Sequence, residues 1–264
     1  MDLSRLCQFA LELAEASDEI SLKYFGGPVP AVAKPDGSPV TEADQAIERM
    51  VRERIAASFP DHAVFAEEGG GAIDPARPTW VIDPIDGTRN FIRGLPIFAT
   101  LIGLVFEGEV VVGVASAPAL GERWDAFRGG GARRNGEAVG VSAIARLEDA
   151  QVLHGGLDWW RDDPRLWELL GMLADRAGRT RGFGDFWIHL LVAGGMADVA
   201  LERDLKPWDV AALDCILTEA GGRCTGWNGS VALSSGSVLS TNGLLHAELL
   251  DLLSDVDEPI EPRP

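Results

Sequence analysis

The chain has 264 residues, of which 41 are acidic and 23 basic, so its formal net charge is -18. Its length allows one large domain or two small ones, and a content of 46% hydrophobic and 24% charged residues is ordinary for a folded, soluble protein. The charge excludes a nucleic acid partner, because binding to a phosphate backbone relies on an excess of Lys and Arg. It fits either a solvated acidic surface or a carboxylate-rich site whose charge a bound metal offsets.

Cysteine, histidine and hydropathy patterns exclude several further classes. The 3 cysteines are too few and too scattered for a disulfide framework or a thiolate zinc site, and the 4 histidines show no spacing typical of metal ligands. The N-terminal stretch carries charged side chains throughout, unlike a secretory signal, and no apolar run is long enough to span a bilayer. We therefore expect a protein of the reducing cytoplasm that has no membrane partner.

The first half of the chain predicts helices packed on an antiparallel sheet. Apolar residues at helical spacing predict a helix over residues 2–25. After a turn-rich loop, Thr41 and Asp44 resemble a capping pair that opens a second helix. The Asp-Pro and Asp-Gly pairs that follow Trp80–Ile82 predict an abrupt end of that strand. The predicted strands lie within 62–66 and within TWVIDPIDGT at 79–88, in a hairpin between Ile97 and Val114, and in short segments within 121–139.

From about Ser142 the pattern changes, and strand-like and helix-like segments alternate. The predicted strands cover 150–155, 197–202 and 237–242, and the predicted helices cover 163–178, 185–195, 207–222 and 243–253. The tail from residue 254 has the composition of a disordered segment. We predict an α+β subdomain over 1–141 and an α/β subdomain over 142–264, joined in one compact body because no linker separates them.

The segment Trp80–Phe91, WVIDPIDGTRNF, places two aspartates three residues apart after an apolar strand. The side chains of Asp83 and Asp86 converge if the backbone between them folds back, as the intervening proline favours. The carbonyl of Ile85 then points into the same space. Carboxylate and carbonyl oxygens are the ligands that Mg²⁺ takes. A solvated turn is the alternative, because aspartate is common in turns that face water.

Further polar groups extend this motif. Gly87 and Thr88 offer backbone N–H groups that suit a phosphate, where a helix or tight turn is expected to begin. Glu67 ends an apolar strand, and Asp209 opens an apolar helix whose N-terminus we expect to be buried. Asp209 can also be an ordinary acid at a helix N-terminus. Together the acidic groups predict a site for two or more divalent metal ions that act on phosphate.

The segments AEE, DPIDGT and WDVAALD followed by EAGG, in this order, resemble the inositol monophosphatase family of Mg²⁺-dependent, lithium-sensitive phosphatases. KPDGSPVTEAD resembles the N-terminal loop and helix of this family, and SAPALGERWDAFRGGGARRNG resembles its hairpin region. The resemblance covers nearly the whole chain and implies a layered αβαβα sandwich of the inositol monophosphatase and sugar phosphatase type. DPIDGTRNFIRGLPIFATLI and GDFWIHLLVAGGMADVALE are most similar to its bacterial histidinol-phosphate phosphatases.

The resemblance implies a role for each motif. It assigns two or three Mg²⁺ ions per site to ligands that comprise Glu67, Asp83, the Ile85 carbonyl, Asp86 and Asp209. Gly87 and Thr88 receive the phosphate. Asp44 and Thr88 position and deprotonate the attacking water, and Glu67 joins them as a catalytic residue. On its residues alone, Asp44 can instead be only the capping partner of Thr41.

Substrate selection is expected from the second half of the chain. The resemblance implies that Glu202 contacts the alcohol part of the substrate and that Asp185 meets an imidazole or amine. Carboxylates that face a cationic leaving group make electrostatic sense, whereas inositol offers only hydroxyls. Asp185 can also be an N-cap of the helix that follows it. Arg89 either steers the phosphate or lies on the surface.

The leading hypothesis is a Mg²⁺-dependent phosphomonoesterase that hydrolyses L-histidinol phosphate in histidine biosynthesis. One alternative is a phosphatase of broader specificity for inositol 1-phosphate. Another is a non-catalytic relative that serves as a binding or regulatory protein, although every metal position is filled. By resemblance we also expect inhibition by millimolar lithium and a homodimer.

Overall fold

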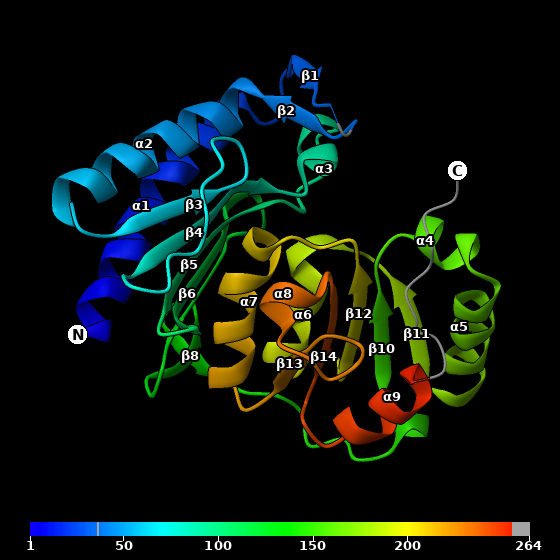
Figure 1. The fold of residues 1–264 in the computed structure, drawn as a ribbon. Helices are drawn as coiled ribbons and strands as arrows, with labels where there is room; N and C mark the ends of the chain where they lie inside the picture. The colour runs from blue at the N-terminus through cyan, green and yellow to red at the C-terminus, as the bar shows by residue number, and fades with distance from the viewer. Residues whose placement is uncertain (36, 255–264) are drawn as a thin grey trace.

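Two N-terminal helices cover one face of a seven-stranded sheet (Figure 1). The computed structural model describes residues 1–35 and 37–254. Helices α1 (Leu3–Tyr24) and α2 (Glu42–Ser58) match the predicted helices, and their apolar faces pack on the sheet around Trp80. The tail with a disordered composition lies, apart from its first residue, outside the described part of the chain.

The seven-stranded sheet has the order β3-β4-β5-β6-β7-β8-β9, in which only the β3–β4 pair is parallel. The predicted hairpin between Ile97 and Val114 is confirmed as β5 and β6. The strands are β3 (Ala63–Ala66), β4 (Thr79–Asp86), β5 (Ala99–Phe106), β6 (Glu109–Ala117), β7 (Glu122–Phe127), β8 (Gly131–Arg134) and β9 (Glu137–Val139). A separate hairpin of β1 (Ala31–Ala33) and β2 (Pro39–Thr41) occupies the stretch that the sequence predicts as loop.

Strand β4 continues through its Asp-Pro pair and ends at its Asp-Gly pair, so only the second of the two predicted stop signals ends the strand. The strand continues to Asp86, and its register with β5 shifts between Asp83 and Asp86. Pro84 is tolerated here because a bulge leaves its missing N–H without consequence, and the hydroxyl of Thr100 donates to its carbonyl at 2.8 Å. In a regular strand, residues three apart face opposite sides of the sheet. The shift therefore allows both carboxylates to face the same side.

A five-stranded sheet forms from the second half of the chain in the order β11-β10-β12-β14-β13. Strand β10 is parallel to β11 and β12, whereas β14 is antiparallel to β12 and β13. The strands are β10 (Gln151–His154), β11 (Arg179–Gly182), β12 (Val199–Arg203), β13 (Arg223–Thr225) and β14 (Ser237–Thr241). The three predicted strands are the central ones. The edge strands β11 and β13 were missed because they are short and their sequences, RTRG and RCT, are polar.

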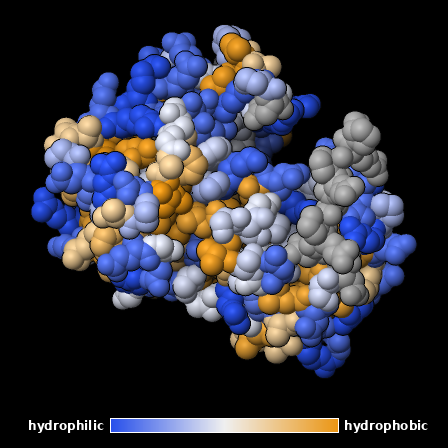
Figure 2. Space-filling model, in the orientation of Figure 1, coloured by the Kyte–Doolittle hydropathy of each residue, from blue (hydrophilic) through white to orange (hydrophobic). Residues whose placement is uncertain are grey.

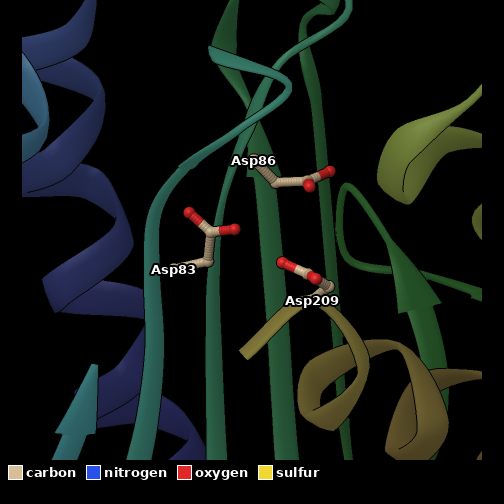
Figure 3. Close-up of side chains that lie close together, drawn as sticks. All are labelled: Asp83, Asp86 and Asp209. Carbon is tan, nitrogen blue, oxygen red and sulfur yellow. The ribbon is translucent and has the colours of Figure 1, made fainter. Parts of the chain in front are cut away.

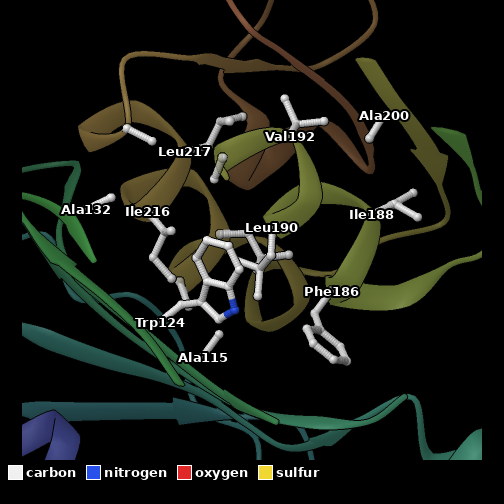
Figure 4. Packing of buried hydrophobic residues seen from close by; sticks show 14 of the residues in the cluster. Ala115, Trp124, Ala132, Phe186, Ile188, Leu190, Val192, Ala200, Ile216 and Leu217 are labelled. Carbon is white, nitrogen blue, oxygen red and sulfur yellow. The ribbon is translucent and has the colours of Figure 1, made fainter. Parts of the chain in front are cut away.

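Helices form the remaining layers (Figure 1). Between the two sheets lie α6 (Asp185–Ala193) and α7 (Pro207–Glu219), where Trp124 of β7 packs with Leu190 and Ile216 (Figure 4). The far face of the five-stranded sheet is covered by α4 (Leu157–Asp162), α5 (Pro164–Arg176) and α9 (His246–Leu253). The short helices are α3 (Thr88–Ile92), α8 (Ala232–Ser235) and 3₁₀ turns at Pro118–Leu120 and Leu147–Asp149. The predicted αβαβα sandwich is confirmed.

Helix α7 packs on the seven-stranded sheet more closely than larger side chains would allow. A Cβ atom added to Gly103 of β5 would lie 2.6 Å from the Cβ of Ala211, and one added to Gly113 of β6 would lie 2.4 Å from the carbonyl oxygen of Ala212. Glycine therefore leaves the room that the helix backbone occupies. This close packing holds α7 against β5 and β6, and Ala211 packs with Val81 of the neighbouring strand β4.

The surface over α2 is mainly hydrophilic, and smaller hydrophobic groups reach the surface between α2 and α8 (Figure 2). Each helix within residues 1–35 and 37–254 is too short or too polar to cross a lipid bilayer.

Candidate active site

Three aspartates from distant parts of the chain meet beside the end of β4 (Figure 3). Asp83 and Asp86 come from β4, Asp209 comes from the first turn of α7, and one carboxylate oxygen of each lies within 4.8 Å of the others. Asp83 is 2% exposed and Asp86 9%, whereas Asp209 is partly exposed. Its apolar sequence predicts that the start of α7 is buried. Instead, Lys206 is exposed and Asp209 is partly exposed, because the start of the helix borders this site.

Within residues 1–35 and 37–254, no basic side chain forms an ion pair with the three aspartates. Burial, together with neighbouring carboxylates, raises the pKa of Asp83 and of Asp86 well above the ordinary range. Burial also raises the pKa of Asp209 to about 7. Within the described part of the chain, the buried Oδ1 atom of Asp83 has no hydrogen-bond partner. A hard divalent cation fits this set, because it supplies both the missing partner and the missing positive charge.

These pKa shifts predict how the metal-free protein responds to pH. The folded state holds protons on the cluster more tightly than the unfolded chain, so its stability should fall as pH rises from about 4 through the pKa of about 7 of Asp209. Asp209→Asn keeps an oxygen for the Lys206 N–H and removes one charge, which should stabilise the metal-free protein by about 1–2 kcal/mol at pH 8.

Thermal unfolding in EDTA between pH 5 and pH 8 measures this effect. The Asp209→Asn protein should unfold roughly 2–6 °C above the parent at pH 8, with a smaller difference at pH 5. An unfolding temperature of the parent that rises steadily across this range, or a variant less stable than the parent at pH 8, would contradict the proposed charge crowding.

Glu67 follows β3 and lies outside the group of three aspartates. The Nζ atom of Lys34 lies 2.7 Å from Oε1 of Glu67 and 2.5 Å from Oε1 of Glu68. Glu67 nevertheless lies near enough to raise the pKa of Asp83. Glu48 of α2 fixes this turn, because its carboxylate accepts the backbone N–H of Glu68 at 2.8 Å. In this structure an ammonium group therefore holds the carboxylate that the resemblance assigns to a metal.

Asp44 is fully buried in the first turn of α2, and its two oxygens differ. Its Oδ2 accepts the backbone N–H of Thr41 at 2.8 Å and the Thr41 hydroxyl at 2.5 Å, so the predicted capping pair is confirmed. Its Oδ1 is buried and, within the described residues, has no hydrogen-bond partner. Burial raises the pKa of Asp44 to about 6 against the lowering effect of the Thr41 bonds. Capping therefore engages only one of the two oxygens.

Gly87 connects β4 to α3 in a conformation that requires glycine. Its φ is 79°, and an added Cβ would lie 2.8 Å from the carbonyl oxygen of Ile97. The hydroxyl of Thr88 donates to the carbonyl of Ile85 at 2.9 Å. This bond fixes the Thr88 side chain beside the aspartates, while one lone pair of the carbonyl stays free to accept another partner.

A second pair of carboxylates lies next to Asp86 at the start of α6. The backbone N–H of Phe186 donates to Oδ2 of Asp86 at 2.7 Å, and that of Asp185 lies 3.4 Å from Oε1 of Glu202. The side chain of Asp185 does not cap α6 but accepts from Nδ2 of Asn90 at 2.7 Å. Burial, followed by Glu202, raises the pKa of Asp185 to about 6.

The structure leaves the role of Arg89 open and adds other residues to the site. Arg89 is exposed, and within the described residues its side chain makes no hydrogen bond or ion pair, so both of its predicted roles stay predictions. Lys34, Glu48 and Asn90 were not predicted to have roles. Lys34 and Asn90 do lie within the quoted motifs KPDGSPVTEAD and DPIDGTRN, but their partners are distant in sequence.

Known proteins place this arrangement in a family. The sequence profile of the Inositol monophosphatase family matches residues 2–258. The chain belongs to the inositol monophosphatase family. The predicted family resemblance is thus confirmed.

Two relatives and one solved structure are similar to this chain over most of its length. The Histidinol-phosphatase of Mycobacterium tuberculosis is 42% identical over 251 residues, which cover 93% of this chain and 96% of the relative. The Histidinol-phosphatase of Chlorobaculum parvum is 41% identical and covers 92% of this chain and 94% of its own. The solved structure of the Thermotoga maritima IMPase is 33% identical with a TM-score of 0.86, over 96% of this chain and 98% of that one.

Proposed function

We propose that the protein is a Mg²⁺-dependent phosphomonoesterase that hydrolyses L-histidinol phosphate to L-histidinol and phosphate. The observation that carries this proposal is the position of two carboxylates, Asp185 and Glu202, directly beside the three aspartates. The three aspartates suit metal cations that bind phosphate, and the pair Asp185 and Glu202 suits an alcohol that carries a positive charge. The name of the two relatives that are 42% and 41% identical supports the same substrate.

The proposed ligands of Mg²⁺ are the carboxylates Glu67, Asp83, Asp86 and Asp209 with the carbonyl of Ile85. All are oxygen donors, as this hard cation requires, and the unpartnered Oδ1 of Asp83 is a free ligand atom. Mg²⁺ bound there would lower the pKa of water and neutralise charge on the phosphate. The ion pair of Lys34 with Glu67 must then loosen, because the same oxygen cannot serve both partners fully.

The remaining residues are proposed to bind the phosphate and to move one proton. The turn at Gly87 brings the backbone close to the phosphate without a side chain in between. Asp44 is proposed to accept a proton from the attacking water through its free Oδ1, while Thr88 orients that water. Water adds to phosphorus, the bond from phosphorus to the alcohol oxygen breaks, and the alcohol leaves with a proton.

The competing substrate is inositol 1-phosphate, since one structural relative carries the name IMPase. Inositol has no positive charge, so the negative charges of Asp185 and Glu202 would stay without a cationic partner against it. We expect kcat/KM for L-histidinol phosphate to exceed that for inositol 1-phosphate and for 3′-phosphoadenosine 5′-phosphate by about 100-fold with Mg²⁺.

Phosphate release from these three esters with purified protein measures the preference. A higher kcat/KM for inositol 1-phosphate would overturn the substrate assignment but leave the phosphatase activity. No release from any ester would favour the non-catalytic alternative. We also propose, from the family resemblance, that the protein is a cytoplasmic homodimer and that lithium inhibits it.

A further inference from the structure

A buried histidine lies behind the carboxylate that is proposed to contact the alcohol part of the substrate. His189 is on α6, is 2% exposed, and has been given no role above, although it lies within the segment GDFWIHLLVAGGMADVALE. Its Nε2 lies 3.3 Å from Oε2 of Glu202, and its Nδ1 lies 2.8 Å from the hydroxyl of Ser240. We propose that His189 is a positioning residue that orients Glu202 towards the cationic part of the substrate, an inference that rests on the proposed function.

The hydrogen bonds assign one tautomer to a neutral imidazole. An ionised Glu202 only accepts hydrogen bonds, so the proton of His189 is on Nε2. Nδ1 is then an acceptor, and the hydroxyl of Ser240 can donate to it. The other neighbour of that hydroxyl, Sγ of Cys224, is 4.0 Å away and a weaker partner. A neutral imidazole therefore satisfies both of its polar neighbours.

The two oxygens of Glu202 face different surroundings. Oε2 faces the interior at His189, whereas Oε1 faces the start of α6 and the N–H of Asp185. A Cβ atom at Gly155 would lie 2.4 Å from Oε1, and one at Gly184 would lie 3.4 Å from it. Glycine at these positions leaves the space that the carboxylate occupies. The imidazole and this space together fix which oxygen is directed towards the site.

Loss of the imidazole should affect recognition of the cation more than the chemistry at phosphorus. Without its donor, Oε2 of Glu202 is a buried acceptor with no partner, which favours rotation of the side chain or its protonation. Either change weakens the attraction for a positive charge. The three aspartates are held by β4 and α7 instead, so binding of the phosphate does not depend on His189.

The test compares His189→Leu and His189→Gln with the parent enzyme, using Mg²⁺ and two esters. L-histidinol phosphate carries a cation, whereas glycerol 2-phosphate does not. For His189→Leu we expect KM for L-histidinol phosphate to rise about 10-fold more than KM for glycerol 2-phosphate, with similar changes in kcat for both. The amide of His189→Gln can donate to Glu202, so it should recover most of this loss. Should the leucine variant fail to fold, His189→Asn, whose amide is too short to reach Glu202, should show the same selective loss.

Glu202→Gln and the double variant separate the possible failures. Glu202→Gln should show the same selective rise in KM, and adding His189→Leu to it should raise KM little further, because both act through one carboxylate. If Glu202→Gln is selective but His189→Leu weakens both esters equally, His189 has only a structural role and the inference is overturned. If Glu202→Gln itself is not selective, the proposed substrate contact is wrong.

Discussion

The Asp86→Asn variant should fold like the parent protein and hydrolyse L-histidinol phosphate about 1,000-fold more slowly. The amide oxygen of asparagine can still accept the N–H of Phe186, which Asp86 accepts at 2.7 Å, so the contact that joins β4 to α6 is kept. What is lost is one negative charge in the group of three aspartates. Because metal binding depends on that charge, the defect should lie in turnover and not in folding.

Phosphate release at saturating Mg²⁺ measures the loss, and thermal unfolding in EDTA measures the fold. Asp198→Asn is a matched control, because Asp198 is also buried, 5% exposed, and accepts a backbone N–H, that of Gln151, at 2.7 Å. It lies before β12, outside the acidic cluster, so its variant should keep its activity. Unchanged phosphate release from Asp86→Asn would remove the basis for the proposed site.

The Asp44→Asn variant is expected to lose about 100- to 10,000-fold in kcat, the range for loss of a general base. Asparagine can keep its oxygen towards Thr41 and so preserve the cap of α2. Its NH₂ group would then replace the free Oδ1, and this group donates hydrogen bonds and cannot take a proton. Activity should therefore fall with little change in unfolding temperature.

Thr41→Val is the complementary variant. It removes the hydroxyl that donates to Asp44 but leaves the carboxylate in place. Loss of a cap costs about 1 kcal/mol, which lowers the unfolding temperature by roughly 2–4 °C. This protein should be less stable yet retain most of its turnover. The opposite outcome, a destabilised Asp44→Asn with normal kcat, would reduce Asp44 to a helix cap.

Local signals in the sequence predict most of the fold. The helix punctuation of α2 and α7 and the hairpin of β5 and β6 depend on neighbouring residues, and the structure contains all of them. For β4 the glycine signal marks the observed end, whereas the proline signal does not stop the strand, because the register shift that accommodates Pro84 depends on the partner strand. Edge strands β11 and β13 have no apolar pattern and were missed, because only their pairing with a neighbouring strand defines them.

Some site residues could likewise be predicted from local sequence signals, whereas others could not. Strand and helix ends locate Asp83, Asp86 and Asp209, and the structure brings them together, although their role as ligands stays a prediction. Contacts such as Lys34 with Glu67 and Asn90 with Asp185 join segments 33 and 95 residues apart, and no local pattern carries that information. The position of the second pair, Asp185 and Glu202, depends on such contacts. From the sequence alone, its role in substrate selection is therefore implied only by the family resemblance.

The glycines beneath α7 have a consequence for biosynthesis. Gly103 and Gly113 leave room for α7 on one face of the seven-stranded sheet, and this helix begins only at Pro207. While the ribosome is still making the intervening residues, that apolar face has no cover, and the acids of β4 lack their third member. A nascent chain therefore cannot complete either its core or its proposed divalent-cation site until α7 has emerged from the ribosome. A chain truncated before α7 would be prone to aggregation and catalytically inactive.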